Sequence, residues 1–213
     1  MEHILAELLS LPGPRRKRPK KIKFWDSSFL ADAGRVERLC RGILEHGLQK
    51  PFRFIAESRA EDIVRAADII PLMKEAGFVR IGCGIESPYK QTHAALKKGL
   101  NPDHVPRAAE LLRAVNIQFS KFYIVGHEGE SEADILAYPD HALKVGFNRQ
   151  HTTFFVMTPY PGTELAARYE ERGLIASSDW SLYTNLGAVV APEGIPPGRL
   201  QVAVRVGAEP HVA

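Results

Sequence analysis

Five short apolar runs recur along the chain at βα intervals, and this pattern constrains the fold more than any other feature. Each run has four to eight residues and is rich in β-branched or aromatic side chains, which is typical of a buried strand. The first residues of successive runs are 30, 26, 41 and 34 positions apart. Such spacing predicts βαβ units and a parallel sheet with right-handed crossovers. The predicted strands are Ile22–Trp25, Phe52–Ala56, Phe78–Ile85, Phe119–Val125 and Thr153–Met157.

Stretches with helical periodicity separate the predicted strands. Asp32 and Thr163 are suitable N-caps, and an additional helical segment is expected around Gln91–Lys98. A weaker apolar stripe over 135–145 contains Pro139, which should kink or break it. The stronger helices are predicted around Val36–Leu44, Ile69–Ala76, Val105–Val115 and Glu164–Arg172.

The first periodic segment, Glu2–Leu9, precedes every predicted strand. The element order is therefore α(βα)₅, whereas a βα barrel normally opens with a strand, so one strand is expected to be absent on the N-terminal side. Residues 1–184 are predicted to form this α/β core. Residues 185–213 are rich in proline and glycine and are predicted to form a loosely ordered C-terminal extension.

Composition excludes several classes of protein. The 28 Lys and Arg nearly balance the 25 Asp and Glu, so the net charge of +3 creates no bulk field for nucleic acid. No apolar run approaches the ~20 residues of a membrane span, and the N-terminus lacks a signal-peptide layout. The two cysteines, Cys40 and Cys83, exclude a disulfide scaffold and any cluster site of three thiolates within the chain. A reducing, cytoplasmic compartment is expected.

Polar side chains follow each predicted strand. Asp26, Glu57 with Arg59, and Glu86 with Ser87 follow the first three strands, and glycine-rich or hydroxyl-rich segments follow the last two. In parallel α/β proteins the carboxyl ends of strands form one rim that carries the ligand site. These segments predict a pocket for a polar ligand. Alternatively, Asp26 and Glu57 cap the helices that follow, although capping suits Asp32 better, and Arg59 pairs with Glu57 or Glu61.

Strand parity refines the predicted pocket. Because side chains alternate faces, Glu86 shares a face with Gly84, Gly82 and Arg80, whereas Cys83 lies on the other face. The two glycines would leave room for a flat ligand beneath Glu86. The alternative is that they are only close-packing positions.

Five stretches resemble segments of one known family. Phe24–Phe29 is similar to its F-x-D-D-x-F segment, and Gly84–Ser87 to its GIES motif. Tyr123–Glu130 resembles (F/M)-I-x-G-x-P-G-E with His and Glu in place of the small residue and proline, and Thr158–Leu165 resembles TP(Y/F)PGT-x-L. Lys97-Lys98-Gly99 resembles a downstream KG. The stretches follow the order of the radical S-adenosylmethionine superfamily, in the branch that often carries a cobalamin-binding domain upstream.

The resemblance implies a partial (βα)₆ TIM-like barrel without its first strand. It also implies reductive cleavage of S-adenosylmethionine, with a [4Fe–4S] cluster, to a 5′-deoxyadenosyl radical. The family holds this cluster on a CxxxCxxC loop that is missing here, and Cys40 and Cys83 are too far apart in sequence to replace it. The chain is therefore expected to be either an N-terminally truncated product, inactive alone, or a cluster-less relative.

Site residues follow from the resemblance by motif position. Asp26 corresponds to the residue that meets the methionine amino group, and Arg59 to a partner for the methionine carboxylate. Glu86 and Ser87 correspond to the ribose-contacting positions. The adenine is expected beside three residues, Gly126, Thr158 and Pro159. The resemblance implies no metal ligand in this chain and leaves the catalytic residues unassigned.

Three functions remain open at the level of the sequence. The first is a radical enzyme core that performs methyl transfer or ring formation on a small-molecule substrate, with an upstream or separate cobalamin domain and a reductant such as flavodoxin or ferredoxin. The second is a cluster-less nucleotide-binding module. The third is an RNA-interacting protein that uses the basic loop 15–21, whose alternative interpretation is a solvated loop.

Overall fold

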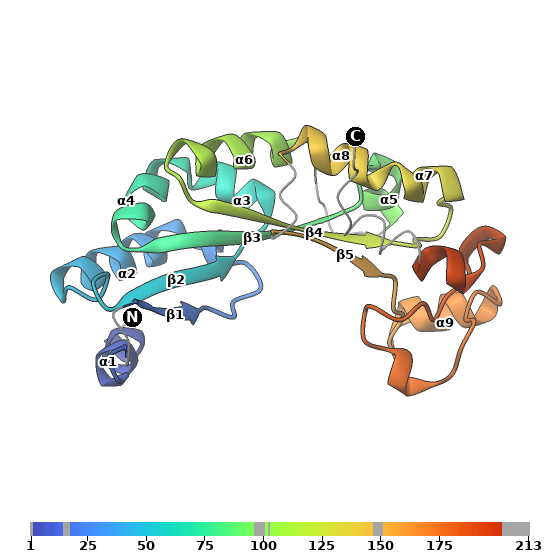
Figure 1. Cartoon of the computed structure of the whole chain (residues 1–213), viewed down its shortest axis with the longest axis horizontal. Coiled ribbons are helices and arrows are strands. Elements are labelled where there is room, and N and C mark those ends of the chain that lie inside the picture. Colours follow the sequence, from blue (N-terminus) through green and yellow to red (C-terminus); the bar gives the residue numbers. More distant parts are fainter. Residues whose placement is uncertain (1, 15–17, 96–100, 102, 147–150, 202–213) are drawn as a thin grey trace. The chain divides into compact units, whose positions relative to one another are not determined.

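The computed structural model describes residues 2–14, 18–95, 101, 103–146 and 151–201. Five strands form one sheet in the order β1-β2-β3-β4-β5, so each strand lies beside its neighbour in sequence. β1 (Lys20–Lys23) pairs in parallel with β2 (Phe52–Glu57), and β2 pairs in parallel with β3 (Phe78–Glu86). The remaining strands are β4 (Gln118–Val125) and β5 (Thr152–Val156). This arrangement confirms the predicted order α(βα)₅ (Figure 1).

Contacts divide the chain into two units. Unit 1 comprises Met1–Gly84 and Asp103–Lys121, and unit 2 comprises Ile85–Pro102 and Phe122–Ala213. The helices of unit 1 are α1 (Glu2–Ser10), α2 (Ala33–Glu45), α3 (Ala60–Arg65), α4 (Ile70–Glu75) and α6 (His104–Ala114), with 3₁₀ turns η1 (Phe29–Ala31) and η2 (Ala67–Ile69).

The core of unit 1 is built on aromatic side chains. Phe54 of β2 and Phe78 of β3 are fully buried and pack with Phe24 and Phe29, with ring centroids 4.9–5.9 Å apart. The helices α2, α3, α4 and α6 lie on one face of the strands of this unit (Figure 1). The β2 pattern of alternating buried and half-buried residues follows, because one face of the strand meets the helices and the other does not.

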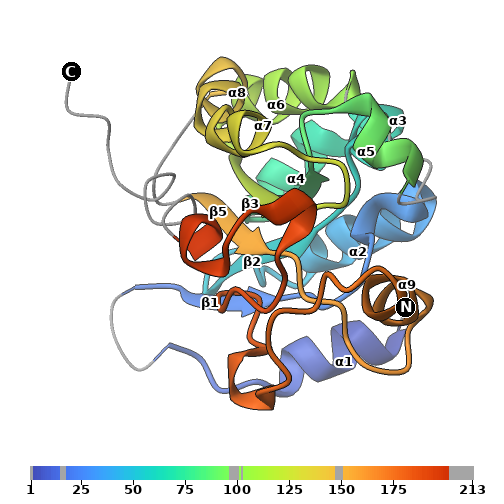
Figure 2. The ribbon, with the colours of Figure 1, turned by 90° about the vertical axis from the view of Figure 1, so that its right-hand side faces the viewer.

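Unit 2 carries the first helix after β3 and the helices that follow β4 and β5. They are α5 (Lys90–Ala95), α7 (Glu132–Leu136), α8 (Tyr138–Lys144) and α9 (Glu164–Glu171), with 3₁₀ turns η4 (Trp180–Leu182) and η5 (Pro192–Gly194) (Figure 2). Tyr123 stacks on Phe154 at 5.2 Å and meets Tyr138 edge-on. Beyond η4, Val190 bridges to Ile175, and Leu200 is fully buried.

The helix signals read from the sequence hold in the structure. Asp32 caps α2 by accepting from the Arg35 amide, and Thr163 caps α9 by accepting from the Ala166 amide. The stripe around Pro139 is broken into α7 and α8. Of the predicted segment Gln91–Lys98, residues up to 95 lie in α5, and the rest lie outside the described residues.

The first strand departs from its predicted bounds, because β1 covers Lys20–Lys23 rather than Ile22–Trp25. Phe24 and Trp25 raised the apolar signal, but the Trp25 side chain is 81% exposed. The short helix α3, with six residues, was not predicted from the sequence. No helix among the described residues is long and apolar enough to cross a membrane.

Candidate functional site

A buried carboxylate organises the turn that follows β4. Glu130 is 2% exposed, and its Oε2 accepts hydrogen bonds from the amides of Gly126 at 3.0 Å and His127 at 3.1 Å. Gly126 has φ +87°, a conformation that L side chains rarely adopt, and this explains glycine at the motif position. The carboxylate therefore fixes the backbone at the predicted adenine end of the site.

The other oxygen of the same carboxylate reaches the end of β3. Glu130 Oε1 accepts a hydrogen bond from Ser87 Oγ at 3.3 Å and one from the Tyr138 hydroxyl, and both donors are fully buried. Burial raises the pKa of Glu130, while the hydrogen bonds from Tyr138, His127, Gly126 and Ser87 act in the opposite direction. Two sequence-predicted site residues, Ser87 and Gly126, are thus brought together by a third that the prediction did not include.

Ser87 is also hydrogen-bonded to residues that follow it in sequence, just before and within α5. The Tyr89 amide donates to Ser87 Oγ at 3.2 Å, and His93 Nε2 lies 2.6 Å from the Ser87 carbonyl oxygen. His93 is 4% exposed, and its Nδ1 makes no hydrogen bond within the described residues. The Ser87 segment is therefore held by several bonds of its own unit.

Glu86 has a strained backbone at the end of β3. Its φ is +63°, and the Ser87 amide donates to the Ile85 carbonyl at 2.8 Å across it. A non-glycine residue in this region costs of order 1–3 kcal/mol, and such residues cluster at functional sites. The side chain of Glu86 is half-buried, whereas that of Cys83 is fully buried.

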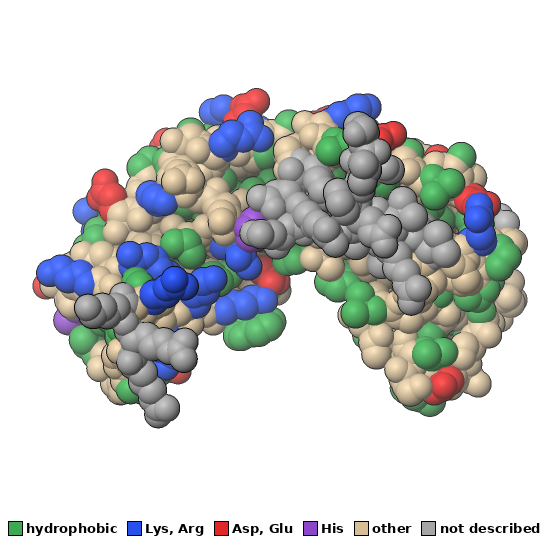
Figure 3. Space-filling model, viewed as in Figure 1, with side chains coloured by type: hydrophobic (Ala, Val, Ile, Leu, Met, Phe, Trp, Pro, Cys, Tyr) green, Lys and Arg blue, Asp and Glu red, His purple; other side chains and the backbone are tan. Residues whose placement is uncertain are grey.

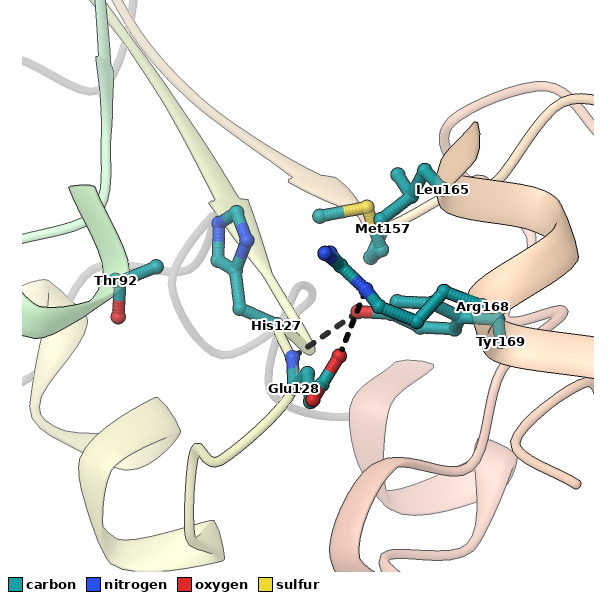
Figure 4. A pocket seen from close by; sticks show the side chains of 7 residues that line it. All are labelled: Thr92, His127, Glu128, Met157, Leu165, Arg168 and Tyr169. Carbon is teal, nitrogen blue, oxygen red and sulfur yellow. Dashed lines mark hydrogen bonds and ion pairs between the residues drawn. The ribbon is translucent and has the colours of Figure 1, made fainter. Parts of the chain in front are cut away.

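A small pocket lies beside the Glu130 turn in unit 2 (Figure 4). Its enclosed volume of about 10 Å³ is close to that of one water molecule, so the pocket by itself is too small for a ligand. His127 faces it from the turn after β4, and Glu128 forms an ion pair with Arg168 at 3.1 Å. The full lining is Thr92, His127, Glu128, Met157, Leu165, Arg168 and Tyr169.

Two backbone amides, those of Glu128 and Met157, donate the hydrogen bonds that hold the walls of this pocket. The Glu128 amide donates to the Tyr169 hydroxyl at 3.0 Å, and burial raises the pKa of Tyr169 to about 12. The Met157 amide donates to the Val125 carbonyl at 2.8 Å. This bond holds the segment after β5 alongside the end of β4. The pocket therefore has apolar walls beside polar backbone groups.

Thr158 and Pro159 follow β5 and are both buried. The Thr158 hydroxyl donates to the Val156 carbonyl at 3.0 Å, so it is engaged with the backbone. Any contact to a ligand would therefore come from the backbone of this segment, as the motif position suggested.

The predicted site residues of unit 1 have partners on their own segments. Asp26 accepts a hydrogen bond from Arg35 at 2.6 Å, and Arg59 pairs with Glu61 at 2.7 Å. Of the two partners considered for Arg59, the structure thus selects Glu61. Asp26 does not cap a helix.

A hydroxyl network missed by the sequence analysis links the ends of β1 and β2. Ser28 Oγ donates to Asp62 Oδ2 at 2.5 Å and accepts from the Arg59 amide at 3.2 Å. Ser58 Oγ accepts from the Leu30 amide at 2.8 Å. Ser28 and Ser58 belong to the polar segments recognised in the sequence, but Asp62 gives no signal there because it lies inside the unpredicted α3.

The cysteines of the chain do not fit an iron–sulfur cluster. Cys40 in α2 and Cys83 in β3 are both fully buried, and burial raises the pKa of Cys40 to about 12. Among the described residues, no three His, Cys, Asp or Glu side chains are grouped as metal ligands. A site with three thiolates cannot be made from the two cysteines of this sequence.

Comparison with known proteins gives a family match. The model of the radical SAM superfamily matches residues 16–142. An uncharacterized methyltransferase of Pyrococcus horikoshii is 25% identical over 171 residues, which cover 80% of this chain and 36% of the relative. The anaerobic magnesium-protoporphyrin IX monomethyl ester cyclase of Synechocystis is 26% identical over 172 residues, covering 80% of this chain and 33% of the cyclase. The chain thus spans about a third of the length of these relatives.

A solved structure shows the same fold. The radical S-adenosylmethionine methyltransferase TsrM from Kitasatospora setae, with cobalamin and a [4Fe–4S] cluster bound, aligns with a TM-score of 0.60 at 16% identity. The alignment covers 96% of this chain and 39% of TsrM. The predicted fold class, an α/β partial barrel, is confirmed.

Proposed function

We propose that this chain, which belongs to the radical S-adenosylmethionine superfamily, binds S-adenosylmethionine at the carboxyl ends of its strands. Members of the superfamily use S-adenosylmethionine and a [4Fe–4S] cluster. The single observation that carries the proposal is the Glu130 carboxylate, which joins Ser87 and the Gly126 turn in unit 2. These are the two motif segments that the family resemblance assigns to the ribose and the adenine.

The residues would have distinct roles. Glu86 would accept hydrogen bonds from the ribose hydroxyls, and its left-handed backbone would aim the carboxylate away from the regular strand direction. Ser87 and Gly126 would position the backbone around the nucleoside. Thr158 and Pro159 would offer backbone groups beside the adenine, for which the apolar Met157 and Leu165 provide a suitable wall.

Asp26 and Arg59 would bind the methionine end. The carboxylate of Asp26 suits an ammonium group, and the planar fork of Arg59 suits a carboxylate. Both side chains already have partners, Arg35 and Glu61, and would exchange or share them on binding.

The activity of the whole protein would be methyl transfer or ring formation on a small molecule. A methyltransferase and a cyclase among the relatives support these two outcomes. A cobalamin domain and a reductant such as flavodoxin or ferredoxin are the partners that this chemistry would require.

Titration with S-adenosylmethionine by calorimetry tests the proposed site. We expect Glu86→Gln to weaken binding by about 3- to 12-fold, because the neutral amide keeps an acceptor oxygen but loses the charge assistance, which is about half of a bond worth about 1.5–3 kcal/mol. Glutamine keeps the size of the side chain and the same backbone demand, so folding is preserved. Cys83→Ala is the matched control on the same strand, and it should leave the affinity unchanged. Equal affinity of Glu86→Gln and wild type would contradict the proposal.

The chain alone should bind no iron–sulfur cluster and should not cleave S-adenosylmethionine, since it supplies two thiols rather than three. The cysteine count also favours a second candidate, a cluster-less nucleotide-binding module. Anaerobic reconstitution followed by visible absorption distinguishes the outcomes: a stoichiometric cluster signal that responds to S-adenosylmethionine would contradict both expectations. Supplying a separate CxxxCxxC segment and regaining cleavage would favour the enzyme over the module.

A further inference from the structure

One face of β1, β2 and β3 in unit 1 carries cations in register. Lys23 is the partner of Ile55, and Ile55 is the partner of Arg80, so the three residues form a row across the sheet. In the row below, Lys21 is the partner of Arg53. The β2–β3 register shifts between Phe54 and Ile55, so Phe54 is the partner of Phe78 and Ile55 is the partner of Arg80. Lys and Arg side chains gather over β1 and β2 in the space-filling view (Figure 3).

This face has too few acids to neutralise its cations. Within the parts of β1, β2 and β3 that belong to unit 1, Glu57 is the one acidic residue in the sequence. It pairs with Lys23 at 2.6 Å, and both side chains are about one-third exposed. Four strand cations on this face therefore accompany one strand carboxylate in unit 1, and this excess of cations remains when Glu86, at the end of β3 in unit 2, is counted as well.

Arg80 has a buried donor atom that is not compensated within the described residues. Its Nε is buried and makes no hydrogen bond within the described residues. Arg53, in contrast, donates through Nη1 to the carbonyls of Gln49 at 2.5 Å and Phe52 at 2.8 Å. A buried donor without an acceptor carries a desolvation cost that an incoming acceptor would remove.

We propose that the row Lys23–Ile55–Arg80 binds an anionic group, carboxylate or phosphate, of the substrate. Neighbouring strands are about 4.8 Å apart, so the two cations flank Ile55 at roughly 10 Å between Cα atoms, a span that their long side chains close over one oxyanion. Gly82 follows Arg80 on the same face and places no side chain above it. The assignment of the anion to a substrate rests on the function proposed above.

Trp25 provides a direct reporter for this row. Lys23 Nζ lies 3.5 Å from the centre of the Trp25 ring, and this ring is 81% exposed. The chain has two tryptophans, so Trp180→Phe leaves Trp25 as the sole indole. Capture of Lys23 by an anion should change the cation–π contact and hence the indole fluorescence.

The experiment titrates the Trp180→Phe protein with succinate and, separately, with inorganic phosphate at constant ionic strength. We expect a saturable fluorescence change with at least one of them, and the preferred probe identifies the chemical class of the anion. Arg80→Met should weaken the affinity by about tenfold to a hundredfold, and Arg80→Lys should restore part of it. Lys20→Met is the matched control, because it also removes one positive charge. Lys20 directly precedes Lys21 in β1, so its side chain lies on the face opposite to Lys21 and Lys23.

Several results would overturn the inference. Chloride acting as well as either probe, or Lys20→Met weakening affinity as much as Arg80→Met, would show only a solvated basic face. Salt-dependent RNA binding that needs Lys20 and Lys21 equally, without probe saturation, would show a nucleic-acid surface instead. If S-adenosylmethionine binds but the anions do not, this inference fails alone. If the anions bind but S-adenosylmethionine does not, the proposed function fails and the row remains an anion site without an assigned substrate.

Discussion

The charged groups of the Glu130 turn in unit 2 and of the cationic row in unit 1 differ in how far they are neutralised by internal partners. The carboxylate of Glu130 accepts four hydrogen bonds, all from its own unit. Of the cations in the row, Lys23 pairs with Glu57, and the buried Nε of Arg80 makes no hydrogen bond among the described residues. The first charge is used to hold the backbone in place, whereas the second can still bind an external partner. A charged group whose hydrogen-bond partners all lie within its own unit serves the structure, whereas one that lacks such partners is available to bind a ligand.

Removing the Glu130 carboxylate should have the largest effect on stability. Glu130→Ala leaves the amides of Gly126 and His127 and the hydroxyls of Ser87 and Tyr138 without their acceptor. We expect the free energy of unfolding to fall by about 3–5 kcal/mol, measured by urea denaturation. A loss below about 1 kcal/mol would mean that the turn does not depend on this carboxylate.

The isosteric variant Glu130→Gln gives this comparison a pH test. Burial raises the pKa of Glu130, so the folded chain binds this proton more tightly than the unfolded chain. The associated stability is present below the ordinary carboxyl pKa and is lost as pH rises through the raised one. Wild type should therefore lose stability relative to Glu130→Gln over that window, and parallel curves would contradict the assignment.

Lys121 should show the next largest effect, with the opposite pH dependence. It is 1% exposed on β4, and burial, with a smaller contribution from Arg113, lowers its pKa from 10.5 to about 8. Between these values the unfolded chain binds more protons, so the free energy of unfolding should rise with pH by about 3 kcal/mol. Lys121→Met should abolish the rise in denaturation curves recorded from pH 7 to 10.5.

Lys50→Met, at an exposed position, is the control for the loss of a lysine. Its pH curve should follow that of wild type. If the Lys50 and Lys121 variants behave alike, the buried ammonium does not limit the stability of unit 1.

The sequence predicted what local chemistry determines. The five strands follow from β-branched and aromatic runs, and the caps Asp32 and Thr163 follow from their short oxygen-bearing side chains. The sequence predicted that Ser87 and Gly126 lie near each other, because both follow strands whose carboxyl ends form one rim. It did not predict which side chain joins them. The hydrogen bonds that join them come from Glu130, which belongs to a recognised motif but has no sequence signal for this role.

Other features depend on tertiary environment and had no sequence signal. Lys121 lies within an apolar run and becomes fully buried, whereas Trp25 ends an apolar run and becomes exposed. Arg80 was placed on the face of Glu86 by parity, but its row with Lys23 required the strand register. Pairing register and burial arise from packing between distant segments, so periodicity alone could not give them.

The N-caps allow the smallest effect to be measured separately in each unit. Thr163→Ala removes the acceptor of the Ala166 amide in unit 2, and Asp32→Ala removes that of the Arg35 amide in unit 1. Each should cost about 1 kcal/mol, while Thr163→Ser should cost much less because it keeps the hydroxyl. Hydrogen exchange should show faster exchange at Ala166 in Thr163→Ala, with Arg35 unchanged, and the converse in Asp32→Ala. Equal acceleration at both amides in either variant would mean that the units open together, so that the Glu130 turn and the cationic row could not be treated as independent sites.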